Sequence, residues 1–360
     1  MRRTEAESGM REGGHDGVFR GPLDRSWDDE GVIPKDLSPD TDYLFARMTR
    51  ETLRAVHASP GEKVLDVGCG RGLDLACQGP TGALLFGLDG SSVMIRKACA
   101  TLQEKGLPQC LVCAAAEGLP FPSATFHKVY CKGAIDHFYD PGRAVREMVR
   151  VLLPGGRIVL SVANFESLGC RLGKLYNRLH KALRGRELPR PHFWEIPADH
   201  CSKFDHSLSV GLLPHEVRLC EDVGISLLWG FPHWGQILRS LPRGLSRGCL
   251  KGLDLAARRI PSLADVVVIT AIKSGEAVCA RDAKRMENEG GKKMKNYSRV
   301  QGVLLCLSTV LAAVLFLVGL AMESYWAVAI PVAIGFFWLL GLGFWIGWTL
   351  VTIKVEPDKD

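Results

Sequence analysis

Short apolar runs alternate with helix-like patterns between residues 61 and 162, after an amphipathic stretch at 40–57. In that first stretch apolar residues recur at near-helical spacing, which predicts a helix that covers a core. The later runs have the length of buried strands, and their alternation with helices is typical of βαβ units in a parallel sheet. The expected strands are 63–67, 83–88, 110–114, 127–131 and 157–162.

Two later apolar runs predict a closing pair of strands. They cover 225–230 and 265–272, and β-branched residues dominate the second. Before the fifth strand, Leu-Leu-Pro-Gly-Gly at 152–156 predicts the end of a helix and a turn. The pattern therefore predicts an α/β domain over residues 39–273. Its core is a Rossmann-like, seven-stranded, mostly parallel sheet flanked by helices.

The C-terminal part of the chain has a different pattern. Between Val300 and Val351 the only charged residue is Glu323. The apolar runs at about 300–322 and 326–351 are each long enough to cross a hydrocarbon core of about 30 Å, so residues 300–352 are expected to form a transmembrane helical hairpin. The motif Gly343-x-x-x-Gly347 is compatible with a homodimer through these helices.

Basic residues flank these two runs, at 292–299 before the first and at Lys354 after the second. By the positive-inside rule the α/β domain and both termini should lie in the cytoplasm. The expected location is the cytoplasmic membrane, with a multi-pass topology. The N-terminus has no apolar stretch of the kind that a secretory signal needs.

The two remaining segments have little periodicity. Residues 1–38 are rich in Gly, Asp, Glu and Arg and are expected to form a flexible or loosely docked arm without an assigned chemical role. Residues 274–299 are expected to be a charged linker. Within it, Glu-Gly-Gly-Lys-Lys-Met at 289–294 can be back-translated into a ribosome-binding site before a start codon, which leaves a fusion of two genes open.

Charge and cysteine content narrow the class of protein. A formal net charge of +6 is too small to indicate nucleic acid, so no nucleic-acid partner is expected. The 12 cysteines are scattered and lack the dense spacing of a secreted disulfide scaffold, which favours a reducing compartment.

A glycine-rich turn follows the first predicted strand. The stretch from Val64 to Gly72 is Val-Leu-Asp-Val-Gly-Cys-Gly-Arg-Gly. Glycines let a backbone approach a ligand closely, and the N-terminus of the next helix favours an anionic group. The spacing is G-x-G-x-G, Leu73 stands where the dinucleotide fingerprint has its third glycine, and Asp66 precedes the first glycine by two residues. This favours S-adenosylmethionine (SAM) over NAD.

An acid closes the second predicted strand about 20 residues later. Asp89 ends the run Phe-Gly-Leu-Asp, from which its carboxylate could accept hydrogen bonds from two ribose hydroxyls. Three more segments follow: Ala-Glu-Gly-Leu-Pro-Phe at 116–121, Ile-Asp-His-Phe at 135–138 and Arg-Val-Leu-Leu-Pro-Gly-Gly at 150–156. Over about 62–162 the chain resembles the class I SAM-dependent methyltransferases, specifically the small-molecule and quinone-biosynthesis type.

The resemblance implies a SAM site with a role for each segment. Asp66 and the glycine turn would line the methionine part, Asp89 would hold the ribose, and residues 116–117 would border adenine. Residues 91–94 would border the adenosine pocket, and residues 131–133 would form the floor near the sulfonium. The implied SAM-binding residues are Asp66, Gly68, Cys69, Gly70, Gly72, Asp89, Gly90, Ser91, Met94, Ala116, Glu117, Cys131 and Lys132.

The chain departs from the family pattern at two positions. Ala115 stands where the family usually has an Asp that binds the adenine amino group, so adenine affinity is lower or Glu117 compensates. His127 replaces the acid common after the phenylalanine of the fourth strand. Both positions are expected to lie in the pocket, so a family member without catalytic activity remains an alternative.

The resemblance places Asp136 and His137 at the mouth of the site, after the fourth strand. Either could act as the base for a hydroxyl or phenol acceptor. A His137 that only packs beside the cofactor is an equal alternative. Residues 163–223, where the family builds acceptor specificity, contain several histidines close to Cys201, without paired ligand spacing. Substrate contacts or a lid are therefore expected there, and no metal.

One segment of that region has the pattern of an interfacial helix. Leucines recur at 168, 172, 175, 179 and 183, and arginines and lysines occupy the rest of the helix. The leucines could contact a membrane or pack on the core, and both alternatives stay open. The segment 237–260, with several leucines and arginines, is a second candidate contact.

The expected function is transfer of a methyl group from SAM to a small-molecule or lipid acceptor at a membrane, such as a quinone precursor or a lipid-linked glycan. Two alternatives remain. One is a methyltransferase of a soluble metabolite or protein that is merely tethered to the membrane. The other is a SAM-binding membrane scaffold without catalysis.

Overall fold

The structure is a computed structural model that describes residues 24–30, 37–189, 192–195 and 200–274. The chain divides into two compact units, Met1–Ala277 and Val278–Asp360, and every described residue belongs to the first. The two expected transmembrane helices and nearly all of the expected linker lie outside the described residues. Among the described helices, none is long and apolar enough to span a bilayer.

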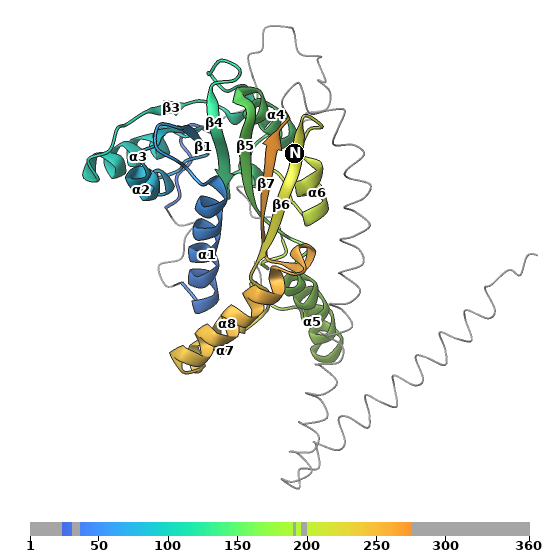
Figure 1. Cartoon of the computed structure of the whole chain (residues 1–360). Coiled ribbons are helices and arrows are strands. Elements are labelled where there is room, and N and C mark those ends of the chain that lie inside the picture. Colours follow the sequence, from blue (N-terminus) through green and yellow to red (C-terminus); the bar gives the residue numbers. More distant parts are fainter. Residues whose placement is uncertain (1–23, 31–36, 190–191, 196–199, 275–360) are drawn as a thin grey trace, which may run out of the picture. The chain divides into compact units, whose positions relative to one another are not determined.

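Seven strands form one sheet in the order β3-β2-β1-β4-β5-β7-β6 (Figure 1). Strands β1 to β5 are parallel to one another, and β7 is antiparallel to both β5 and β6. This confirms the expected mostly parallel Rossmann-like sheet. The strands are β1 (Lys63–Val67), β2 (Leu84–Asp89), β3 (Leu111–Cys113), β4 (Phe126–Lys132), β5 (Leu152–Ala163), β6 (Val217–Ile225) and β7 (Val266–Lys273).

The strand order reverses between β1 and β4. From β1 the chain moves outward through β2 and β3, and then returns to place β4 on the other side of β1. Ligands of open α/β sheets bind outside the carboxyl ends of the strands at such a switch point. The topology therefore selects the carboxyl ends of β1, β2 and β4 as the edge where a site should lie.

Helices and short 3-10 turns connect the strands. The α-helices are α1 (Pro39–Val56), α2 (Leu73–Gln78), α3 (Ser92–Glu104), α4 (Pro141–Val151), α5 (Leu168–Arg184), α6 (His206–Gly211), α7 (Trp234–Ser240) and α8 (Arg243–Ala257). The 3-10 turns are η1 (Gly79–Thr81), η2 (Ala116–Gly118), η3 (Ile135–His137) and η4 (Pro261–Leu263).

Each face of the sheet buries its own apolar cluster, because side chains alternate across a strand. One face packs Leu65 and Val129 against Met148 of α4. The other packs Val64 and Tyr130 against α1, whose apolar side is buried as its spacing predicted. The helix that the pattern placed at 40–57 is therefore confirmed as a cover of the core.

Two expectations about strand positions are wrong. The strand expected at 225–230 is β6, which ends at Ile225, because Ser226 and Leu228 have φ of 58° and 71° and turn the chain. At 152–156 the expected helix end is confirmed, since α4 ends at Val151, but the expected turn is a bulge within β5, with Gly155 at φ 76° beside a shift in the β4–β5 register. Apolar content alone did not locate these strand ends, since long-range pairing sets them.

Candidate active site

The glycine turn connects β1 to α2, and its three glycines all have positive φ. At Gly68 (φ 78°) a Cβ would lie 2.4 Å from the Cβ of Ala134, so this glycine allows close packing. At Gly70 (φ 51°) a Cβ would meet no atom within 4 Å. The turn therefore closes tightly on the protein at Gly68 and leaves open space at Gly70, as a backbone that approaches a ligand requires.

Asp89 ends β2 beside this turn. Its Oδ2 accepts the N–H of Gly70 at 2.9 Å, and its Oδ1 accepts the N–H of Ser91 at 2.8 Å. Burial raises the pKa of Asp89, while these two N–H groups and the nearby charge of His137 oppose the rise. The carboxylate stays partly accessible, so its remaining lone pairs can accept two hydroxyl donors.

The start of α3 lies next to Asp89. The Ser91 hydroxyl oxygen accepts the N–H groups of Val93 and Met94, which caps the helix. The same hydroxyl donates to the backbone carbonyl of Trp27 at 2.6 Å. The Met94 side chain is buried, and the carbonyl of Gly90 accepts the Cys113 thiol. The structure thus places the expected adenosine-side residues together around the end of β2.

Glu117 lies in η2 and is buried with Ala116. Its Oε1 accepts the N–H of Asp140 at 3.1 Å, and its carbonyl accepts Nε of Arg143 at 2.8 Å. Glu117 therefore joins η2 to the start of α4. One of its carboxylate oxygens is already engaged, which limits the compensation for Ala115 that the sequence suggested.

Asp66 and Lys132 belong to a polar cluster on the α1 side of the sheet. The Lys132 ammonium donates to Asp74 at 2.8 Å and to the Thr49 hydroxyl at 2.7 Å. Burial and the charge of Asp74 raise the pKa of Asp66 well above its ordinary value, and the Tyr130 hydroxyl donates to it. Asp66 in β1 and Asp74 in α2 flank the glycine turn along the chain.

Cys69 and Cys131 are both buried, and burial raises the pKa of each thiol well above its ordinary value. Cys131 packs in the cluster on the α4 side, opposite to Lys132. These two expected site residues therefore supply packing, and neither thiol is activated as a nucleophile.

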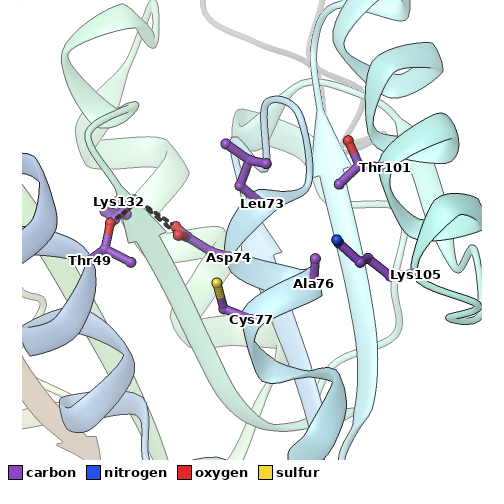
Figure 2. A pocket seen from close by; sticks show the side chains of 8 residues that line it. All are labelled: Thr49, Leu73, Asp74, Ala76, Cys77, Thr101, Lys105 and Lys132. Atoms are coloured by element: carbon purple, nitrogen blue, oxygen red, sulfur yellow. Dashed lines mark hydrogen bonds and ion pairs between the residues drawn. The ribbon is translucent and has the colours of Figure 1, made fainter.

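A cavity of about 440 Å³ lies over α2, between α1 and α3 (Figure 2). Its lining consists of Thr49, Leu73, Asp74, Ala76, Cys77, Thr101, Lys105 and Lys132. Of the SAM-binding residues implied by the sequence, this lining includes only Lys132. The Lys132–Asp74 pair forms one wall of the cavity (Figure 2).

His127 was expected in the pocket, and this is wrong. It lies near the start of β4, where its Nδ1 accepts the N–H of Lys63, the first residue of β1. Both residues are therefore at the amino ends of parallel strands, on the edge opposite to Asp89. The substitution at His127 consequently says nothing about loss of activity.

Three side chains with metal-ligand or acid–base chemistry meet after β4. They are Asp136 and His137 of η3 and His200, and one ligand atom of each lies within 4.8 Å of the others. His200 Nδ1 is 3.1 Å from Asp136 Oδ2, and the rings of His137 and His200 are 4.4 Å apart. The sequence predicts the first two as site residues and places His200 only in the acceptor region, because its partner Asp136 is 64 positions away.

The N-terminal arm also reaches the site, which its composition did not predict. Within residues 24–30, the indole of Trp27 lies 5.4 Å from the ring of His137. Arg71 pairs with Asp29, and Lys97 pairs with Asp28 and Asp29. Residues 24–30 therefore contact the core. Their acids bind Arg71 in the glycine turn and Lys97 of α3.

Comparison with known proteins agrees with this geometry. A family model described as a methyltransferase domain matches residues 65–160. A curated relative, the ubiquinone/menaquinone biosynthesis C-methyltransferase UbiE of Geobacter sulfurreducens, is 32% identical over 35% of this chain and 54% of its own. The ubiquinone biosynthesis O-methyltransferase of Chromobacterium violaceum is 36% identical over 30% of this chain and 47% of its own.

The uncharacterized methyltransferase YcgJ of Bacillus subtilis is 37% identical over 27% of this chain and 39% of its own. The crystal structure of YcgJ aligns with 64% of this chain and 99% of its own chain, at 20% sequence identity and a TM-score of 0.42. The chain thus spans about half or less of the length of these curated relatives. Within that span it carries a class I methyltransferase domain whose cofactor is S-adenosylmethionine.

Proposed function

We propose that the whole chain is an enzyme that transfers a methyl group from SAM to a lipophilic or membrane-associated acceptor, such as a quinone precursor or a lipid-linked glycan. The main support for SAM as the methyl donor is the hydrogen bond from the Gly70 N–H of the glycine turn to Asp89. The exposed leucine face of α5 supports the acceptor half. A location at the cytoplasmic membrane is part of the proposal.

The residues at the end of β2 fit SAM. Open space at Gly70 admits the amino-acid part close to the backbone, and the partly accessible Asp89 carboxylate suits two ribose hydroxyls. The Gly70 and Ser91 N–H groups hold that carboxylate in place before any ligand arrives, which reduces the entropy lost on binding.

Bound SAM supplies a methyl group on a sulfonium, which is already an activated donor. The task of the protein is then to align an acceptor with that methyl group and to exclude water. Trp27 and Phe165 are the large apolar groups beside His137 and His200. They can shield the acceptor from solvent at the carboxyl end of β4.

The exposure of most α5 leucines supports a membrane contact. Gly169, Cys170 and Gly173 are buried, Leu168 packs on a buried apolar cluster, and a Cβ at Gly173 would lie 2.4 Å from the Trp194 ring. The four later leucines of the row face outward, with exposed fractions of 37% at Leu172, 50% at Leu175, 53% at Leu179 and 85% at Leu183. An exposed leucine row is costly in water and favours a lipid surface.

Basic residues make this face complementary to anionic lipid. Exposed arginines and lysines flank the leucines of α5, and more occur on α7 and α8 beside exposed Ile237, Leu245 and Leu255. Helices α5, α7 and α8 project from the end of the sheet where β5 ends and β7 begins (Figure 1). Because β5 is parallel to β4, this is also the end that carries the site.

Calorimetry of SAM with the full chain tests the cofactor half. Asp89→Ala should weaken SAM binding at least about tenfold, since the charged acceptor of the ribose hydroxyls is lost. Asp205→Ala is the matched control, because Asp205 also accepts a backbone N–H, that of Leu208 at 2.8 Å, but caps α6. Equal affinity of wild type and Asp89→Ala would contradict the site.

Transfer from SAM labelled in the methyl group tests the acceptor half. The full chain in detergent should move label into a total lipid extract. Label found only in water-soluble products would favour the tethered enzyme for soluble acceptors. Binding of SAM without transfer to lipid, metabolite or protein fractions would favour the scaffold.

A further inference from the structure

The cavity over α2, between α1 and α3, is a candidate for a second binding site (Figure 2). Its volume of about 440 Å³ is within the range of roughly 300–1,000 Å³ that is typical of small-molecule sites. Asp89 and the glycines of the turn, on which the proposed SAM site depends, do not belong to its lining. The cavity can therefore take a ligand other than SAM.

The walls of this cavity are mainly apolar. Leu73, which begins α2, is 59% exposed, and Ala76 follows on the same helix. The Thr49 hydroxyl accepts the Lys132 ammonium at 2.7 Å, and the Thr101 hydroxyl donates to a backbone carbonyl of α3 at 3.0 Å. With these hydroxyls engaged, both threonines offer chiefly methyl groups to a ligand. The cavity therefore suits an apolar body.

One of the two ammonium groups in the lining is already neutralised. Lys132 donates to Asp74 at 2.8 Å, and the two side chains are 23% and 10% exposed. Because the pair is largely removed from water, breaking it would leave a poorly solvated charge behind. The pair between Lys132 and Asp74 is therefore a wall of the cavity and not a place where an anion binds.

The other ammonium group is available to an anion. Lys105, directly after α3, lies 3.9 Å from the carboxylate of Glu104, and these side chains are 58% and 78% exposed. Such a contact contributes only about 0–1 kcal/mol. Figure 2 shows Lys105 extending from α3 toward Ala76 of α2. The lining has two ammonium groups and one carboxylate, which leaves one positive charge unmatched within it.

We propose that this cavity binds an anionic amphiphile, a small molecule with an apolar chain and one carboxylate. The chain lies against Leu73 and Ala76, and the carboxylate pairs with Lys105. A single negative charge matches the one unmatched positive charge of the lining. A cationic amphiphile would be repelled by that charge, and a neutral one would lack the ion pair. A medium-chain fatty acid has the required chemistry.

Cys77 provides a reporter of ligand in the cavity, because its thiol is exposed and belongs to the lining. The full chain in phosphatidylcholine vesicles is alkylated with iodoacetamide, a neutral reagent, and mass spectrometry gives the rate at each cysteine. Saturating octanoate should slow alkylation of Cys77 at least about fivefold, because it blocks access to the thiol. The rates at Cys110 and Cys220, which are exposed but outside the lining, should stay within about twofold.

Three other ligands test the proposed chemistry. Octanol should protect Cys77 only at concentrations at least about fivefold higher than octanoate, because it cannot form the ion pair. Octylammonium should give no protection. Saturating SAM, which also carries a carboxylate, should leave the rate at Cys77 within about twofold, because it binds at the end of β2.

Two variants separate the charge from the apolar wall, each compared with its own rate without ligand. Lys105→Gln should raise the octanoate concentration that halves the rate at Cys77 at least about fivefold, without changing that of octanol. Leu73→Ala should raise both concentrations about fivefold or more, because apolar contact is lost. Arg96→Gln is the matched control, since it removes the same charge from an exposed position of α3 outside the lining.

Three results would overturn the site: octanoate that protects Cys77 no more than Cys110, octylammonium that protects as well as octanoate, or equal octanoate concentrations for Lys105→Gln and Arg96→Gln. Protection of Cys77 by SAM as strong as that by octanoate would assign the cavity to the cofactor and contradict the proposal. None of these measurements depends on the identity of the methyl acceptor.

Discussion

Alanine substitutions at Gly70 and Gly155 separate two effects, which are the folding free energy lost to a strained backbone and the loss of SAM binding. Both glycines have positive φ, 51° and 76°, and a Cβ at either would meet no atom within 4 Å. Each substitution to alanine should therefore cost about 1–2 kcal/mol of folding free energy. Only Gly70→Ala should also weaken SAM binding, by about tenfold or more, because its Cβ enters the space proposed for the cofactor.

Chemical denaturation measures the first effect, and calorimetry with SAM measures the second. Gly155→Ala is the control, since Gly155 lies in β5. If Gly70→Ala binds SAM as tightly as Gly155→Ala does, the cofactor does not approach the glycine turn.

Asp265 should make the stability of the domain depend on pH. Burial raises its pKa to about 7, although the N–H of Trp229 donates to Oδ2 at 3.0 Å. The ordinary value is 3.8, so between these two values the folded state binds more protons than the unfolded state. The contribution of Asp265 to the free energy of unfolding is therefore greatest below about pH 4, and it falls as pH rises to about 7.

The fall should be at most about 4 kcal/mol, from the difference between the two pKa values. Asp265→Asn should remove it and leave a flatter profile of unfolding free energy against pH, measured by urea denaturation. Asp222→Asn, at a half-exposed position, is the comparison. A slope unchanged by Asp265→Asn would show that the carboxyl group is not responsible.

At the scale of elements, the segment from Asp24 to Glu30 is attached to the core by charge. Hydrogen bonds from Arg71 lower the pKa of Asp29 to about 2, so the attraction is complete above about pH 4 and is lost only as pH falls through 2. Arg71→Gln should release the segment at neutral pH. A partly exposed ion pair contributes about 0.2–1 kcal/mol. Its loss should therefore raise the fraction of molecules with a detached segment by up to about fivefold.

Limited trypsin digestion followed by mass spectrometry measures how often the segment detaches, from the rate of cleavage after Arg25. Cleavage there should be up to about fivefold faster in Arg71→Gln, and high salt should speed up the wild type. Arg54→Gln is the control, because Arg54 pairs with Glu51 and Glu221 elsewhere in the domain. Equal rates in the two variants would contradict a charge-held segment.

Helix α5 shows how a neighbour decides which face of an amphipathic helix is buried. Its leucine row alone is equally suited to a core and to a membrane. The close approach of Trp194 and of the Trp229 backbone selects the glycines of α5 as the contact. The four later leucines of the row are then left outside, although the periodicity of the helix is unchanged.

At the scale of the whole molecule, the site and the exposed leucines share one end of the sheet, so membrane contact and catalysis should be coupled. Leu175→Glu with Leu179→Glu should slow transfer of label into anionic lipid vesicles at least about tenfold, because burial of each leucine is worth about 1.5–3 kcal/mol. The affinity for SAM should not change. The rate of labelling measures the effect.

The control is Leu208→Glu, which introduces the same charge at a leucine on α6 that is 56% exposed. It should leave the labelling rate within about twofold of wild type. Similar rates in the control and in the α5 variant would remove the membrane role of that helix.

Sequence alone determined the α/β class, the glycine turn and the acid at Asp89. These depend on local properties: strand periodicity, the positive φ that glycine tolerates, and a spacing of about 20 residues set by one βαβ unit. The same locality explains two errors, since the strand end at Ile225 and the bulge at Gly155 depend on pairing with distant strands.

Only the tertiary structure decided which residues contact one another in and around the candidate site. It brought His200 to Asp136, placed Trp27 beside His137, moved His127 to the far edge and turned four leucines of α5 outward. Each outcome depends on packing between segments separated by dozens of residues. The free energy of such contacts comes from burial and geometry in three dimensions, which a periodic pattern along one chain does not encode.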